Sequence, residues 1–133
     1  GVNVGVPGGI PHRKAIGAEH LAVFTDIKKK HSAHAVTADV DVVQTAHAAE
    51  FFLSDGLILT GAATGEAASV AELRAVYAAT KLPVFVGSGL TAENAKDYLP
   101  VADAFIVGSY FKRAGQWENP LDPGRIHRLL DQI

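Results

Sequence analysis

The residues best suited to chemistry follow the apolar run LAVF, where the sequence continues as TDIKKKHSAH. Alternate residues of a strand point to one face, so Asp26, Lys28 and Lys30 would share a face. A carboxylate, an amine and an imidazole at this place could act as a general acid–base pair, an amine nucleophile or a phosphate clamp. The alternative is a solvated loop whose lysines favour solubility. We predict Asp26, Lys30 and His31 as catalytic residues.

Two later apolar runs end in the same Gly-Ser pattern. PVFV leads into Gly87, Ser88 and Gly89, and AFIV leads into Gly108 and Ser109. Glycine lets the backbone approach a ligand closely, and free amides beside the start of a helix suit a phosphate. The alternative is that these glycines only permit tight turns. Because the pattern recurs at two consecutive runs, we predict that both ends bind an anion.

The middle apolar run, GLIL, leads into TGAATGEA. Thr60 and Thr64 offer hydroxyl groups there, and Gly61 and Gly65 free the backbone. The stretch lacks the lysine and the spacing of a P-loop, which excludes nucleoside triphosphate binding by that route. We predict a ligand-facing loop, with a plain turn as the alternative.

Four near-continuous apolar runs must position these residues, and they cover residues 21–27, 56–60, 83–87 and 104–108. Such runs are typical of parallel strands that are covered on both faces. Residues 2–4 have the character of a fifth strand, cut short. The sequence therefore predicts a parallel sheet.

Helical patterns separate the apolar runs. The first pattern extends from Asp39 to about Leu53, with Thr37 or Asp39 as its cap, and its apolar stripe consists of Val42, Ala46, Ala49 and Leu53. SVAE at 69–72 has the spacing of a capping box, and TAEN at 91–94 opens a shorter helix that runs through residues 95–99. DPGR at 122–125 places Asp at the cap and Pro in the first turn. The last apolar face consists of Ile126, Leu129, Leu130 and Ile133.

The resulting order, (β)βαβαβαβα, fits two architectures of the α/β class. One is a piece of a (β/α)8 TIM barrel, and the other is an open flavodoxin-like parallel sheet. A complete barrel takes about 250 residues, so this chain would supply roughly half. We predict that residues 1–133 form a single domain, the C-terminal half of a TIM barrel with strands 5–8 and a remnant of strand 4. In either architecture, ligands bind at the carboxyl ends of the strands.

Composition excludes several classes of function. A net charge of −2 gives no reason to expect a nucleic-acid partner, and no run approaches the ~20 apolar residues of a membrane span. The absence of cysteine excludes disulfides, Cys-ligated zinc and thiol catalysis, and it is compatible with a cytoplasmic location. His31 and His34 make a weak pair without a third ligand, so we predict neither a metal site nor a cofactor.

Several long segments, in this order, resemble the BtpA/SgcQ family: DIKKKHS, DGLILTGAATG, LPVFVGSGLTAENA, ADAFIVGSYFKRAGQWENPLD and RIHRLL. The resemblance implies a TIM barrel of the ribulose-phosphate-binding type. The family's Asp-x-x-x-Lys-His motif would fall on Asp26, Lys30 and His31. Its TG-x-x-TG, Gly-Ser-Gly and Val-Gly-Ser segments would fall on the Thr-Gly and Gly-Ser stretches described above. The family's amino-terminal half has no counterpart in this chain.

Taken together, the residues and the resemblance predict a protein that binds a small phosphorylated ligand derived from a sugar or a nucleoside. The chemistry would be of the nucleosidase, isomerase or aldolase kind, and this chain alone would be inactive. The alternative is a non-catalytic assembly or stability factor of the photosystem I biogenesis type, after which the family is named. Because a half-barrel leaves open strand edges, we expect it to form a homo-oligomer or to pair with the missing half.

Overall fold

The computed structural model describes residues 9–28, 41–61 and 66–133. Four parallel strands form one sheet in the order of the chain: β1 (Phe24–Asp26), β2 (Gly56–Leu59), β3 (Val84–Val86) and β4 (Ala104–Phe105). The register pairs Phe24 with Gly56 and Ile58 with Phe85. The predicted parallel α/β sheet is confirmed. Strands that neighbour one another in chain order occur both in barrels and within open sheets, so both predicted architectures fit. Residues 2–4, which suggested a further strand, lie outside the described ranges.

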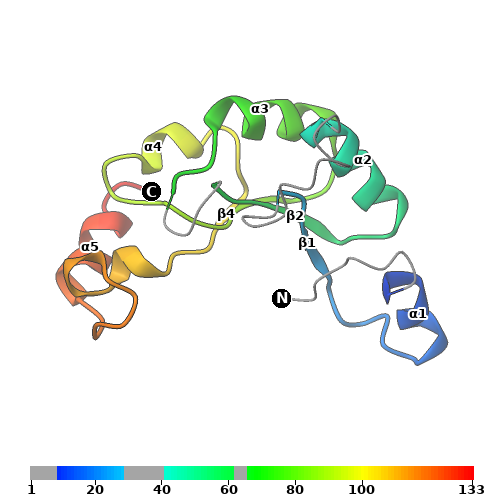
Figure 1. Cartoon of the computed structure of the whole chain (residues 1–133), viewed down its shortest axis with the longest axis horizontal. Coiled ribbons are helices and arrows are strands. Elements are labelled where there is room, and N and C mark those ends of the chain that lie inside the picture. Colours follow the sequence, from blue (N-terminus) through cyan, green and yellow to red (C-terminus); the bar gives the residue numbers. More distant parts are fainter. Residues whose placement is uncertain (1–8, 29–40, 62–65) are drawn as a thin grey trace, which may run out of the picture.

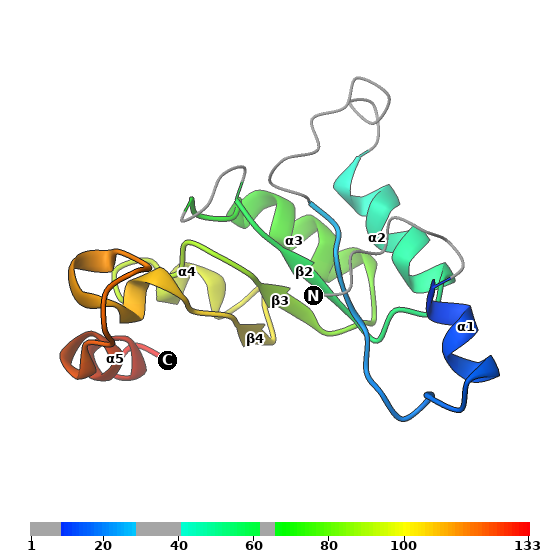
Figure 2. The same ribbon diagram turned by 60° about the horizontal axis from the view of Figure 1, so that its bottom comes forward.

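Helices α2 (Val42–Phe51), α3 (Val70–Ala79) and α4 (Ala95–Tyr98) lie along one face of the sheet (Figures 1 and 2). This placement follows from the strand order, because right-handed crossovers between successive neighbours put each connecting helix on the same side. The core lies between these layers. Its largest fully buried side chains include Leu57, Leu59, Val84 and Val86 from the strands and Leu73 and Val76 from α3.

The opposite face of the sheet is only half-buried, and it carries the alternate residues of the same strands. The rings of Phe24 and Phe85 meet across β2 with their centroids 4.7 Å apart. Gly56 permits this contact, because a Cβ at this position would lie 2.5 Å from the Phe24 ring. The strands were expected to be covered on both faces of the sheet. Among the described residues, helices cover one of these faces (Figure 1).

Helix α2 begins at Val42, and the carboxylate of Asp41 caps it by accepting the Val43 amide at 3.3 Å. The predicted cap at Thr37 or Asp39 is therefore wrong. Ala46 and Ala49 are buried as predicted. Leu53 is 59% exposed, which contradicts its place on the apolar stripe, because the helix ends at Phe51 and Leu53 has a left-handed φ of 66°.

Two of the other three helix starts predicted by sequence are observed with their caps. Ser69 accepts the amide of Glu72 at the start of α3, which is one half of the predicted capping box. Within the described residues, the Glu72 carboxylate pairs with Lys28 and does not return to the cap. Asp122 accepts the amides of Gly124 and Arg125 at the start of α5 (Pro123–Leu130). Leu129 is buried as predicted, whereas Leu130 and Ile133 are exposed, so the predicted apolar face of this helix is too wide.

The TAEN segment forms a turn before α4. The side-chain oxygen of Asn94 accepts the amide of Thr91 at 2.8 Å, and the Ala95 amide donates to the Thr91 carbonyl. The buried anchor of α4 is Tyr98, whose hydroxyl donates to the Ala68 carbonyl at 2.7 Å. Burial raises the pKa of this phenol. Leu99, which was expected to belong to the helix, lies past its end and is exposed.

Helix α1 (Gly9–Ala15) was not predicted, and it is tied to the amino ends of β1 and β2. Its Arg13 guanidinium donates to the Asp55 carboxylate and to the Leu21 carbonyl, each at 2.5 Å. The same carboxylate accepts the Val23 amide at 2.7 Å. Hydrogen bonding from Arg13 and then from Val23 lowers the pKa of Asp55. This contact lies at the end of the sheet opposite to the predicted site.

Across the described ranges, no helix has the length and apolar character needed to cross a bilayer.

Candidate functional site

The carboxyl ends of the four parallel strands meet at one edge of the sheet, and those predicted site residues that the structure describes lie there. Asp26 ends β1, Thr60 follows β2, Gly87 follows β3, and Gly108 comes soon after β4. The sequence prediction that these residues share one edge is therefore supported by the strand order. Lys30, His31, Thr64 and Gly65, which belong to the predicted site, lie outside the described residues, as does His34.

A pocket of about 280 Å³ opens between the loops that follow β3 and β4. It is bordered by residues 87–91 from one loop and residues 106–110 from the other. Ser88 and Ser109 thus line a common hollow. Gly115 and Arg125 complete the lining from the segment beyond β4.

Backbone amides suited to an anion are present on both sides of the pocket. No hydrogen bond within the described part of the chain uses the N–H of Ser88, Gly89, Gly108 or Ser109. Gly108 also has open space where a Cβ would stand. A ligand could therefore approach this part of the backbone without meeting a side chain, and it would find unused donors there.

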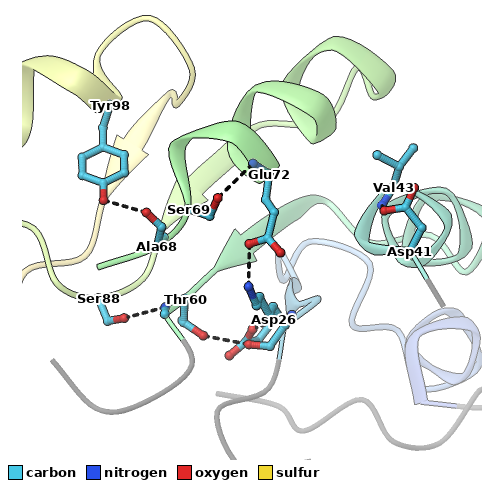
Figure 3. Close-up of polar contacts among 11 residues, drawn as sticks. Asp26, Asp41, Val43, Thr60, Ala68, Ser69, Glu72, Ser88 and Tyr98 are labelled. Atoms are coloured by element: carbon cyan, nitrogen blue, oxygen red, sulfur yellow. Dashed lines mark hydrogen bonds and ion pairs between the residues drawn. The ribbon is translucent and has the colours of Figure 1, made fainter. Parts of the chain in front are cut away.

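Ser88 has a structural task in addition to its place at the pocket. Its hydroxyl accepts the Gly61 amide and donates to the Glu66 carbonyl, both at 3.2 Å. Figure 3 shows the contact with the loop after β2. Ser88 thereby joins the two predicted ligand loops, and its hydroxyl proton is committed to protein. The Gly61 amide is likewise occupied.

Two glycines of this region are required by packing. Gly89 has a φ of +71°, and a Cβ there would collide with the backbone of Glu66 and Ala67. A Cβ at Gly87 would lie 2.6 Å from Ile58 Cγ2 and 2.7 Å from Thr60 Cγ2. The alternative interpretation, that glycine serves tight geometry, therefore holds for these two positions. It does not account for Gly108, where a Cβ would have no described atom within 4 Å.

Arg125 and Tyr110 are pocket residues that the sequence analysis missed. The Arg125 Nε donates to the Tyr110 carbonyl at 2.5 Å, and the guanidinium carbon lies 4.4 Å from the centroid of the Tyr110 ring. Arg125 stands in the first turn of α5, so its contact with the loop after β4 depends on tertiary structure. The DPGR pattern placed Arg125 at the helix start but did not predict its contact with Tyr110.

The charged end of β1 is arranged differently from the prediction. Lys28 Nζ pairs with Glu72 Oε2 of α3 at 2.5 Å, and both side chains are about a third exposed (Figure 3). The Lys28 carbonyl accepts the Thr60 hydroxyl at 2.7 Å, and its amide donates to Asp26 Oδ1 at 3.1 Å. The period-two pattern ends with β1 at Asp26, and Lys28 belongs to the turn that fixes this carboxylate. Of the three predicted catalytic residues, only Asp26 is described.

Glu93 adds negative charge near the pocket. Its pKa is lowered by a hydrogen bond from its own backbone amide, then by one from the Thr91 side chain. The positive charges of Arg128 and Arg125 contribute smaller effects in the same direction. Glu93 forms no ion pair with either arginine within the described residues.

A family model described as the BtpA family matches residues 6–133. The chain belongs to the BtpA family. The resemblance noted in the sequence is thereby confirmed, and it covers all of the loops that form the pocket.

BtpA relatives occur in bacteria, archaea and an animal. An uncharacterized mitochondrial protein of Caenorhabditis elegans is 47% identical over 130 residues, which are 97% of this chain and 47% of the worm protein. An uncharacterized protein of Archaeoglobus fulgidus is 35% identical over 130 residues, covering 98% of this chain and 50% of the relative. The photosystem I biogenesis protein BtpA of Synechocystis is 31% identical over 123 residues, which are 92% of this chain and 42% of the Synechocystis protein. The chain thus spans about half the length of the curated relatives it matches.

Proposed function

We propose that this BtpA-family chain binds a small phosphorylated ligand, derived from a sugar or a nucleoside, in the pocket between the loops after β3 and β4. The proposal is carried by the backbone amides of Ser88, Gly89, Gly108 and Ser109, which lie on both sides of one pocket and donate to no atom of the described residues. Phosphates in proteins are commonly held by such amides. The half-buried Arg125 adds the positive charge that an anion requires.

We further propose that the four strands are strands 5–8 of a TIM barrel, with the half-buried sheet face turned toward its interior. Three observations support this: the sequential strand order, the placement of α2–α4 on one face, and the chain's match to about half of its relatives. In barrels of this kind, the loops after strands seven and eight commonly hold a phosphate. Those loops would be the two that border the pocket.

In this proposal Asp26, Lys30 and His31 carry acid–base or carbonyl chemistry at the mouth of the barrel. Nucleosidase-like hydrolysis, isomerisation and aldol cleavage all use such groups. Asp26 is positioned for this by the turn that its Oδ1 makes with the Lys28 amide. The missing half of the barrel would complete the site, so the 133-residue chain alone would be inactive. A cytoplasmic location is part of the same proposal.

The second candidate function is a non-catalytic role in assembly. It is favoured by one observation, which is that the Synechocystis relative is named for photosystem I biogenesis. A scaffold protein of this kind would not need the unused amides of the pocket. Ligand binding therefore discriminates between the two functions.

The test is the melting temperature of the intact protein in a panel of sugar phosphates and nucleotides. Ligand at a hundred times its Kd stabilises a protein by about 2.7 kcal/mol, so a rise of a few degrees is expected with the right compound. Gly108→Leu fills the open space beside the loop and should abolish the rise without lowering the starting melting temperature. Ala71→Leu, on the exposed side of α3, is the control and should preserve it. If no compound in the panel raises the melting temperature of the wild-type protein, the assembly role is favoured.

A further inference from the structure

The pocket contains one cation among its described lining residues, and that cation has no acidic partner. Arg125 is half-buried, yet it forms no ion pair with any described carboxylate. Its Nε is used by the Tyr110 carbonyl, and its two terminal nitrogens donate to no described atom. Glu93 acts on this guanidinium only at a distance longer than an ion pair. A partly desolvated guanidinium that makes no ion pair within the described residues is suited to binding an anion.

The structure holds this guanidinium in one place. The bond from Nε to the Tyr110 carbonyl fixes the position of the group, and the Tyr110 ring supports its face at 4.4 Å. Stacking of this kind stabilises a cation while leaving the edge of its plane available. Asp122 accepts the Arg125 amide, so the helix start also fixes the backbone of this residue.

Tyr110, the residue beneath Arg125, also contains a polar group without a partner among the described residues. The residue is 8% exposed, and its hydroxyl has no hydrogen-bond partner within the part of the chain that the structure describes. A buried hydroxyl without a partner is costly, and native proteins normally explain such a group by a water or a ligand. This hydroxyl belongs to a residue that lines the pocket.

We propose that Arg125, supported by Tyr110, is the residue that recognises charge in this pocket, and that its ligand is a phosphomonoester dianion rather than a carboxylate. This inference rests on the proposed function. The amides on the two loops and the free edge of Arg125 present donors from three sides. A phosphomonoester has three terminal oxygens to meet them, whereas a carboxylate has two.

The experiment is calorimetric titration of the intact protein with inorganic phosphate at pH 7.5, where the anion is largely doubly charged. Arg125→Gln should weaken phosphate binding at least about tenfold, because a bidentate, charge-assisted contact is lost. Arg128→Gln is the matched control, since it removes the same charge from an exposed position of the same helix that does not line the pocket. The affinity of Arg128→Gln for phosphate should stay within about twofold of that of wild type.

Two further arms make the result decisive. Arg125→Lys keeps the charge but loses the planar fork and the stacking, so it should bind phosphate several-fold more weakly than wild type. Acetate should bind the wild type at least about tenfold more weakly than phosphate. If Arg125→Gln fails to fold, unchanged affinity in Arg125→Lys would overturn the role of Arg125.

The two proposals fail in different ways. If wild type binds phosphate and Arg125→Gln binds it equally well, the pocket stands and the role of Arg125 is refuted. If acetate binds as tightly as phosphate, the assignment of a phosphomonoester is refuted. If wild type binds no phosphate at all, the proposed function fails and this inference fails with it.

Discussion

At the scale of single residues, the molecule separates its polar groups into two ends with different tasks. At the amino ends of the strands, Asp55 is fully engaged by Arg13 and Val23, which ties α1 to the sheet. At the carboxyl ends, Arg125 lacks a carboxylate partner within the described residues, and nearby amides are unused. Structural charge is paired, and the charge at the pocket is left available.

The first prediction concerns Asp55. Its folded-state pKa is lowered, so its contribution to stability is present above the ordinary carboxyl value of about 3.9 and is lost as pH falls through the folded-state value. Asp55→Asn should lower the free energy of unfolding at pH 7 by up to about 1 kcal/mol, because the side chain is partly exposed. The difference from wild type should shrink progressively as pH is lowered below the ordinary carboxyl pKa, as followed by chemical denaturation.

The exposed Asp97 is the control, and Asp97→Asn should show a smaller effect at pH 7. A loss for Asp55→Asn that persists unchanged at low pH would show that the contact does not depend on the carboxylate charge.

At the scale of elements, the loop after β3 is held by glycine geometry. Gly89→Ala places a side chain at a φ of +71° and against the backbone of Glu66 and Ala67. The left-handed conformation alone costs about 1–2 kcal/mol, so unfolding in urea should show at least this loss. Gly108→Ala is the matched comparison in the neighbouring loop, where the φ is −111° and an added Cβ would have no described atom within 4 Å. Equal effects of the two substitutions would contradict this account of the loops.

Sequence predicted the elements well where their signals are local. The apolar runs predicted the strands and the edge at which their carboxyl ends meet. Ser69 and Asp122 predicted two helix starts, because a capping side chain and the amide that it accepts lie within three residues of each other. The errors at Leu53 and Leu130 arose because periodicity does not show where a helix ends or which neighbour covers it. The contacts of Glu72 with Lys28 and of Arg125 with Tyr110 join separate elements, so no local pattern could reveal them.

At the scale of the whole molecule, the sheet leaves one face half-buried and strand edges open among the described elements. Edges of this kind invite further pairing. We predict that the 133-residue chain, produced by itself, forms a dimer or a larger assembly in analytical ultracentrifugation at micromolar concentration. Co-production with the amino-terminal half of a family member should replace this assembly with a one-to-one complex. A monodisperse monomer of the chain alone would contradict self-association.

The central claim is that the loops after β3 and β4 bind a phosphate through their backbone amides. Titration of the ¹⁵N-labelled intact protein with inorganic phosphate, followed in ¹H–¹⁵N correlation spectra, tests it most directly. The claim predicts saturable shifts centred on the amides of Ser88, Gly89, Gly108 and Ser109, while Gly17, near the opposite end of the sheet, stays unmoved. Spectra in which those four amides do not move, or in which the largest shifts lie elsewhere, would contradict it.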